Sequence, residues 1–94
     1  NVMFYEEMIN KPVFREQKRL TLDVEVMAGA YFDSKEVDTL KLPNHCVIIN
    51  IHRDRKDISP VGQTILPGDQ LTIELDAQDI EKLYEPLVSM ANIY

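Results

Sequence analysis

The chain has 94 residues, 45% hydrophobic and 28% charged, which is typical of one small globular domain. Its formal net charge of −6 argues against nucleic acid or anionic lipid as the main partner, because phosphate binding depends on a surplus of Lys and Arg. A single cysteine, Cys46, excludes an internal disulfide and suits a reducing cytosol, and no apolar run is long enough to cross a bilayer.

The first nineteen residues have the character of a connector. Val2, Tyr5 and Ile9 predict a short helix over residues 2–10 that Pro12 would end, and the charged stretch 15–19 is typical of a linker. We therefore expect a connector over residues 1–19 and a folded domain over residues 20–94. Since the chain opens on Asn rather than Met and shows no signal peptide, we expect it to be part of a longer protein.

Two elements are predicted in the first half of the domain. Strict alternation of apolar and polar residues over 20–26 predicts a half-buried strand. Ser34 is a candidate N-cap for a short helix over residues 35–40, and Pro43 would close this element.

The segment 45–53, HCVIINIHR, is apolar on both parities, which predicts a strand covered on both faces. We expect Leu22, Ile49 and Ile73 to share one core. Asn50 interrupts this apolar run on the parity of Ile48. It is either a hydrogen-bonded Asn in the core or at an edge, or a residue that lines an interface or a small pocket.

The charged residues 53–57 predict a solvated turn, followed by a return strand over 58–61 that Pro60 would confine to a sheet edge. Pro67 and Gly68 then predict a type II turn, because Gly supplies the positive φ at its third position. Alternation over residues 70–75 predicts a second half-buried strand.

A final helix is predicted from Asp76, its candidate cap, to Ala91. Pro86 either kinks this helix or starts a second short one. The predicted fold class is therefore α+β: a four-stranded sheet with a short helix after the first strand and a C-terminal helix. The expected core stripe of the helix consists of Ile80, Leu83, Tyr84, Leu87, Val88 and Ala91.

No pattern of reactive residues indicates catalysis, so we expect a protein that is not an enzyme. His45 and His52 lie on opposite parities of one segment, and Cys46 belongs to no CxxC pattern, so we expect no metal site. The sixteen Asp and Glu residues are spread over strand faces, turns and helix surfaces, and no spacing selects a catalytic pair.

Three segments in order resemble the RCK C-terminal domain, also called the TrkA-C domain: KEVDTLKLPNHCVIINIHR (35–53), ISPVGQT (58–64) and ILPGDQLTI (65–73). Within this family, LPNHCVIINIHR is most similar to the version appended to bacterial ClC-type chloride channels and transporters. Ser34 stands where the family often has Gly, and Asn50 where a small apolar residue is common.

The resemblance implies a cytosolic regulatory and dimerisation domain at the cytoplasmic face of the membrane, linked to an upstream transmembrane domain. The same module also occurs in potassium-uptake systems, cation–proton antiporters and GntR-type transcription regulators, where it would act only in dimerisation. The resemblance implies a homodimer that makes no nucleic acid contact through this domain.

Several members of the family bind cyclic di-AMP between protomers, so the resemblance implies this nucleotide as the ligand and no other cofactor. Apolar side chains would stack on the adenines, and Arg53 would offer two donors to a phosphate. The positions that match the ligand-contacting strand and return are Val47, Ile48, Asn50, Arg53, Ser59 and Pro60.

Overall fold

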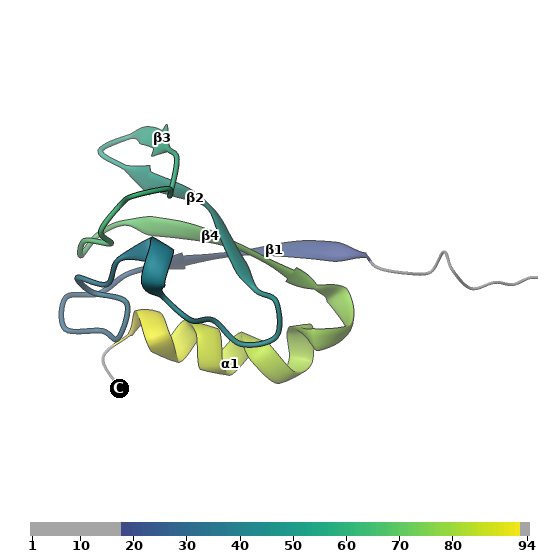
Figure 1. Ribbon diagram of the computed structural model, residues 1–94. Coiled ribbons are helices and arrows are strands. Elements are labelled where there is room, and N and C mark those ends of the chain that lie inside the picture. The colour runs from purple at the N-terminus through teal and green to yellow at the C-terminus, as the bar shows by residue number, and fades with distance from the viewer. Residues whose placement is uncertain (1–17, 93–94) are drawn as a thin grey trace, which may run out of the picture.

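The computed structural model describes residues 18–92, which form one antiparallel sheet with a helix along one face (Figure 1). The strand order is β1-β4-β2-β3, so β1 and β3 form the edges. The predicted α+β class is confirmed, whereas the predicted helix over 2–10 lies outside the described residues. In chain order the elements are β1 (Arg19–Glu25), η2 (Val37–Thr39), β2 (Val47–Arg53), β3 (Lys56–Ile58), β4 (Gln70–Asp76), η3 (Ala77–Asp79) and α1 (Ile80–Ala91).

β1 and β4 pair along their whole length, with Leu22 opposite Ile73. The even-numbered residues of β1 and the odd-numbered residues of β4 point toward α1. Leu71, Ile73 and Leu75 are fully buried there. Both alternation patterns were therefore interpreted correctly. The face away from α1, here called the open face, carries the polar residues of both strands.

β2 departs from the prediction because it contains a β-bulge. Ile48 pairs with Ile73 and Asn50 pairs with Thr72, so Ile49 is an extra residue without a partner on β4. The bulge resets the alternation, and Ile48 and Ile51 both enter the core, 7% and 0% exposed. Ile49 remains 44% exposed, so the expectation that it shares the core with Leu22 and Ile73 is wrong.

The expectation that β2 is covered on both faces is also wrong for this single chain. Val47 is 48% exposed, and Asn50 and His52 lie on the open face opposite Thr72 and Gln70. No described element covers the apolar side chains of Val47 and Ile49.

The β2–β3 hairpin is tighter than predicted. Asp54 and Arg55 have φ of 52° and 67°, the left-handed pair that a two-residue type I′ turn requires. Arg53 therefore pairs directly with Lys56, and β3 spans 56–58 rather than 58–61. Pro60 lies beyond this edge strand instead of within it.

The predicted helix over 35–40 is a single 3₁₀ turn, η2, and Ser34 does not cap it. Ser34 has a φ of 69°, and its hydroxyl donates to the neighbouring Asp33 carboxylate at 3.0 Å. A left-handed residue cannot serve as the extended N-cap of a helix. This conformation explains why a glycine would suit the position.

The turn before β4 matches its prediction. Gly68 has a φ of 91°, and the Asp69 N–H donates to the Leu66 carbonyl at 3.1 Å. These are the features of the type II turn that Pro67 and Gly68 predict.

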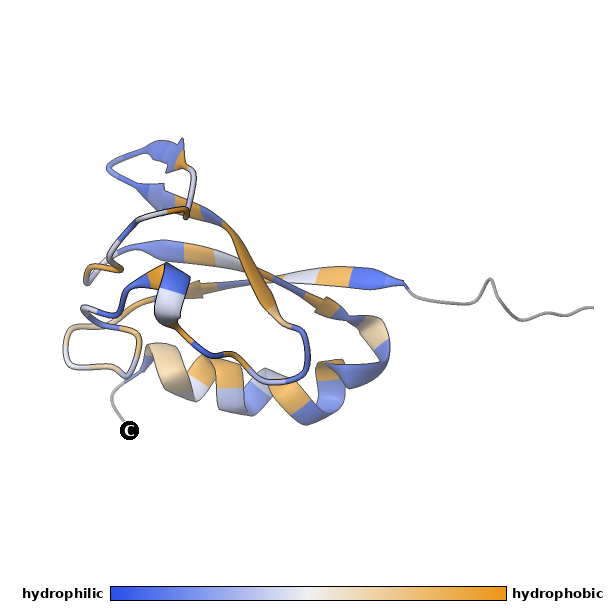
Figure 2. Cartoon of the chain, in the orientation of Figure 1, coloured by the Kyte–Doolittle hydropathy of each residue, from blue (hydrophilic) through white to orange (hydrophobic). Residues whose placement is uncertain are grey.

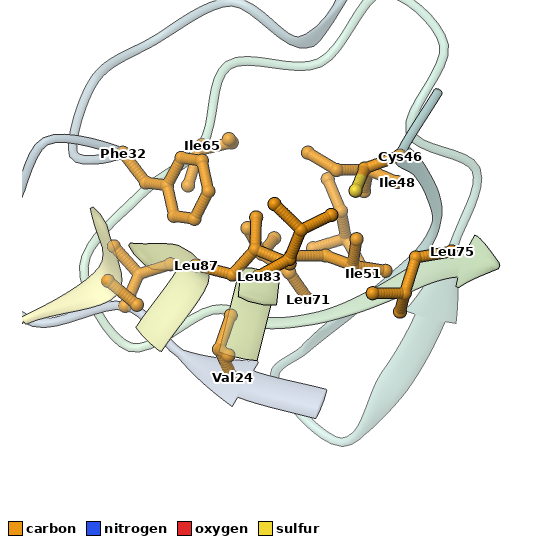
Figure 3. Close-up of a cluster of buried hydrophobic side chains, with 13 residues drawn as sticks. Val24, Phe32, Cys46, Ile48, Ile51, Ile65, Leu71, Leu75, Leu83 and Leu87 are labelled. Atoms are coloured by element: carbon orange, nitrogen blue, oxygen red, sulfur yellow. The ribbon is translucent and has the colours of Figure 1, made fainter. Parts of the chain in front are cut away.

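α1 runs through Pro86 as one helix, and it packs Leu83, Leu87 and Ala91 against the sheet. Asp76 lies at the N-cap position of η3, but no capping bond is formed, because its carboxylate accepts from Arg19 at 3.0 Å. Tyr84 is 49% exposed and lies outside the core. In the core, Phe32 and Ile65 lie above Leu87, while Cys46 and Ile48 lie at the other end (Figure 3).

Candidate functional site

The first half of β2 forms a continuous apolar run (Figure 2), and it contains the most exposed apolar residues of the described sheet. Val47 and Ile49 are each nearly half exposed, although an antiparallel strand next to the centre of a sheet commonly buries its apolar residues. Scattered exposed apolar residues are common, but two in one strand beside a bulge mark a candidate contact surface. We call Val47, Ile49 and Asn50, with His52 and Asp57, the β2 surface.

Asn50 is held in place by a polar network across the hairpin. Its amide Nδ2 donates to Asp57 Oδ1 at 3.1 Å, and His52 Nδ1 lies 2.8 Å from the same oxygen. Hydrogen bonds from His52 and then from Asn50 lower the pKa of Asp57 below its ordinary value. The network fixes the Asn50 side chain on the surface and directs its amide oxygen away from Asp57. Asn50 is therefore a half-buried surface Asn with a hydrogen-bond partner.

Arg53 faces the core side of the hairpin and binds the turn before β4. Its Nε and Nη2 donate to the two carboxylate oxygens of Asp69 at 2.8 and 2.7 Å. Nη2 also donates to the Thr64 carbonyl at 2.9 Å, and Nη1 to Gln63 Oε1 at 3.3 Å. The two donors that would form a paired contact with a phosphate are thus engaged by Asp69.

Asp69 is the complementary half of this clamp. It is 1% exposed, and its Oδ2 also accepts from the Leu66 N–H at 2.8 Å. Burial alone would raise the pKa of Asp69, but the hydrogen bonds from Arg53 and Leu66 outweigh it and hold that pKa below its usual range. Since a buried charge needs a partner, the clamp fixes the turn against the end of β2.

The loop after β3 places Ser59 and Pro60 near η2. Ser59 Oγ accepts from the Val61 N–H at 3.3 Å, and the Gly62 N–H lies 3.1 and 3.2 Å from the two carboxylate oxygens of Asp38. Gly62 has a φ of 75°, which favours glycine at this tight turn. Val61 at the tip is 76% exposed.

A small apolar pocket of about 160 Å³ adjoins the start of β2. Cys46 lines it and is 8% exposed, and burial raises the pKa of its thiol. The sequence contains no signal for this pocket, since an apolar residue that lines a cavity has no distinct pattern. The complete lining is Val37, Leu40, Leu42, Cys46, Val47 and Ile48.

The six predicted ligand positions are thus distributed over two sides of the hairpin. Val47 and Asn50 lie on the β2 surface, whereas Ile48 is buried between the pocket and the core. Arg53 is bound to Asp69, and the remaining two, Ser59 and Pro60, lie in the loop beyond β3.

Two exposed cationic side chains lie at the tip of the β2–β3 hairpin, between the exposed carboxylates of Asp54 and Asp57. Arg55 and Lys56 are exposed there, beside Arg53. An anion next to the hairpin would meet these two side chains with no carboxylate already paired to them in the described bonds. Within residues 18–92 no group of three or more His, Cys, Asp or Glu could hold a metal ion. No helix in the same part of the chain is long and apolar enough to cross a membrane.

The TrkA-C domain family matches residues 22–88 of the chain. The match covers the sheet, the β2–β3 hairpin, the clamp and most of α1. No curated protein matches the chain well enough to count as a relative.

Proposed function

Because the chain belongs to the TrkA-C domain family, whose domains are regulatory rather than catalytic, we propose that it regulates a ClC-type chloride channel or transporter. In this proposal the domain lies at the cytoplasmic face of the membrane. Residues 1–19 connect it to an upstream transmembrane domain. The resemblance of LPNHCVIINIHR to the ClC-associated version supports this host.

We propose that the domain acts as a homodimer that holds a small nucleotide, cyclic di-AMP, over the β2 surface. The observation that carries the proposal is the exposure of Val47 and Ile49, 48% and 44%, beside the apolar pocket. Apolar side chains of this kind provide a flat contact for a purine ring, and a second copy would cover the other side of the ligand.

The polar groups of the hairpin suit the rest of such a ligand. Asn50, fixed by Asp57, offers an amide to the edge of a base. Arg55 and Lys56 offer positive charge to phosphates, whereas Arg53 holds the hairpin in shape through Asp69. Ligand would favour the closed dimer and so bias the transporter through the connector, as coupling between sites requires.

Isothermal titration of the chain with cyclic di-AMP tests the proposal. We expect saturable heat with one nucleotide per dimer, and loss of that heat in Val47→Asp and Asn50→Ala. Tyr84→Ala is the matched control, because Tyr84 is as exposed as Val47 but lies on α1. Absence of heat and of any thermal shift with cyclic di-AMP, cyclic di-GMP and ATP would contradict ligand sensing.

A second candidate is a module that only dimerises, on a potassium-uptake system, a cation–proton antiporter or a GntR-type regulator. The observation that favours it is the Arg53–Asp69 clamp, which occupies the guanidinium edge that a sensor would present to phosphate. In that case Val47→Asp weakens dimerisation through the β2 surface, and no nucleotide changes the stability of the dimer.

A further inference from the structure

β1 leaves one side of its backbone without partners. It is an edge strand of seven residues, and no described residue pairs with its outer side. The Lys18 carbonyl accepts from the Ala77 N–H at 2.9 Å, and the Val26 N–H donates to the Asp69 carbonyl at 2.8 Å, both from the side of β4. Since backbone groups alternate in direction along a strand, the even-numbered residues bond to β4.

The odd-numbered residues of β1 therefore direct their N–H and C=O groups outward. Within residues 18–92 these backbone groups form no hydrogen bond. Exposed strand edges are usually protected by charged side chains, a proline, a bulge or a covering segment, and of these β1 has charged side chains at Arg19, Asp23 and Glu25. β1 contains no proline, and its register with β4 is unbroken from end to end. The four outward-directed residues are Arg19, Thr21, Asp23 and Glu25.

The sequence of β1, RLTLDVE, is complementary to itself when two copies run antiparallel about Leu22. Arg19, which also contacts Asp76 and Glu74 of its own chain at 3.0 and 3.5 Å, then lies opposite Glu25 of the second copy. Thr21 lies opposite Asp23, whose carboxylate also accepts from Thr72 at 2.8 Å. Each pair joins opposite charges or a hydroxyl and a carboxylate. Both residues of each of these pairs direct their backbone N–H and C=O groups outward. Every free backbone N–H and C=O of β1 therefore finds a partner in this register.

The apolar side of β1 also matches in this register. Leu20 lies opposite Val24 of the second copy, on the face of the sheet that carries α1. Leu20 is 39% exposed in the single chain, and this contact would cover it. A register centred on Asp23 would instead oppose two aspartates, which is unfavourable. A register centred on Thr21 would place Arg19 opposite Asp23 but would leave Glu25 without a partner in β1, so the register about Leu22 is the one that pairs all four residues.

We propose that a second copy of this chain pairs antiparallel along the outer edge of β1, which joins the two sheets into one continuous sheet. This contact is separate from the β2 surface, because β4 lies between β1 and β2. It does not depend on any ligand. It gives the domain a second means of self-association beyond the proposed nucleotide-dependent dimer.

Sedimentation of variants tests the proposal with Val47→Asp as the background, so that the β2 surface no longer contributes. Thr21→Pro removes one outward donor from each copy and leaves the bonds to β4 intact. Thr21→Ala is the matched control that keeps the donor. We expect Val47→Asp and its Thr21→Ala derivative to dimerise on concentration. The dissociation constant of the Thr21→Pro derivative should be higher by at least about tenfold.

Amide hydrogen exchange of the unaltered chain provides a second test that needs no variant. The amides of Thr21 and Asp23 should exchange rapidly in dilute solution and become protected as concentration rises. Those of Leu22 and Val24, bonded to β4, should be protected throughout.

Three results would overturn the proposal. They are equal dimerisation of the Thr21→Pro and Thr21→Ala derivatives, a strictly monomeric Val47→Asp chain, and protection of Thr21 and Asp23 that is independent of concentration. The last result would mean that another segment of the same chain covers the edge. None of them bears on nucleotide binding, which titration measures independently.

Discussion

The Arg53–Asp69 clamp yields the sharpest prediction on stability, through the substitution Asp69→Asn. The carboxylate accepts three hydrogen bonds of 2.7 to 2.8 Å, two from the Arg53 guanidinium and one from the Leu66 N–H. An amide has only one oxygen, so its NH₂ group must face another donor. The Arg53 charge, with a side chain 22% exposed, would lose its counter-ion.

Removal of one partner from a buried ion pair costs about 3 to 5 kcal/mol, and partial access of water to Arg53 reduces this to about 2 to 4 kcal/mol. For a domain of this size, 1 kcal/mol corresponds to roughly 4 to 8 °C in the midpoint of thermal unfolding. We therefore expect the midpoint of Asp69→Asn to fall by roughly 8 to 32 °C.

Thermal unfolding followed by circular dichroism provides the measurement. Asp57→Asn is the control, because Asp57 also accepts hydrogen bonds but its side chain is 71% exposed, so its midpoint should change by only a few degrees. A decrease below about 4 °C for Asp69→Asn would show that the clamp contributes little to folding.

Three further predictions follow from the packing. Because the pKa of Asp69 is lowered in the folded chain, its ion pair stabilises the fold above about pH 4 and is lost as the pH falls through the folded pKa. The thermal midpoint of the wild type should therefore decrease more steeply in acid than that of Asp69→Asn. Ile48→Ala should cost about 2 to 4 kcal/mol in urea unfolding and Ile49→Ala less than about 1 kcal/mol, and equal costs would contradict the bulge. Cys46, buried and with a raised pKa, should react with iodoacetamide many-fold more slowly in the folded chain than in urea, and equal rates would contradict its burial.

Local patterns along the chain predicted most of the fold. The alternation in β1 and β4, the turn at Pro67 and Gly68, and the apolar stripe of α1 each depend on residues close in sequence. Such patterns have a fixed period, and a buried face enforces it.

The errors occur where the backbone leaves a regular period. The bulge at Ile49 moves one residue out of register, and periodicity alone gives no signal for that insertion. The type I′ turn occupies Asp54 and Arg55 without glycine or asparagine, so the sequence lacked the usual hairpin signal. Ser34 in a left-handed conformation is a similar case.

The candidate site was only partly accessible from sequence. A resemblance indicated the strand and loop that contain the six positions, but the pairing of Arg53 with Asp69, sixteen residues away in the chain, required the fold. The exposure of Val47 likewise follows from tertiary structure, because an apolar residue in an apolar run is expected inside.

A titration of the isotope-labelled chain with cyclic di-AMP, followed by amide chemical shifts, tests the nucleotide site on the β2 surface most directly. We expect saturable shifts at Val47, Ile49 and Asn50, with no change at Tyr84. No shift at all, or shifts confined to α1, would contradict a nucleotide site on the β2 surface.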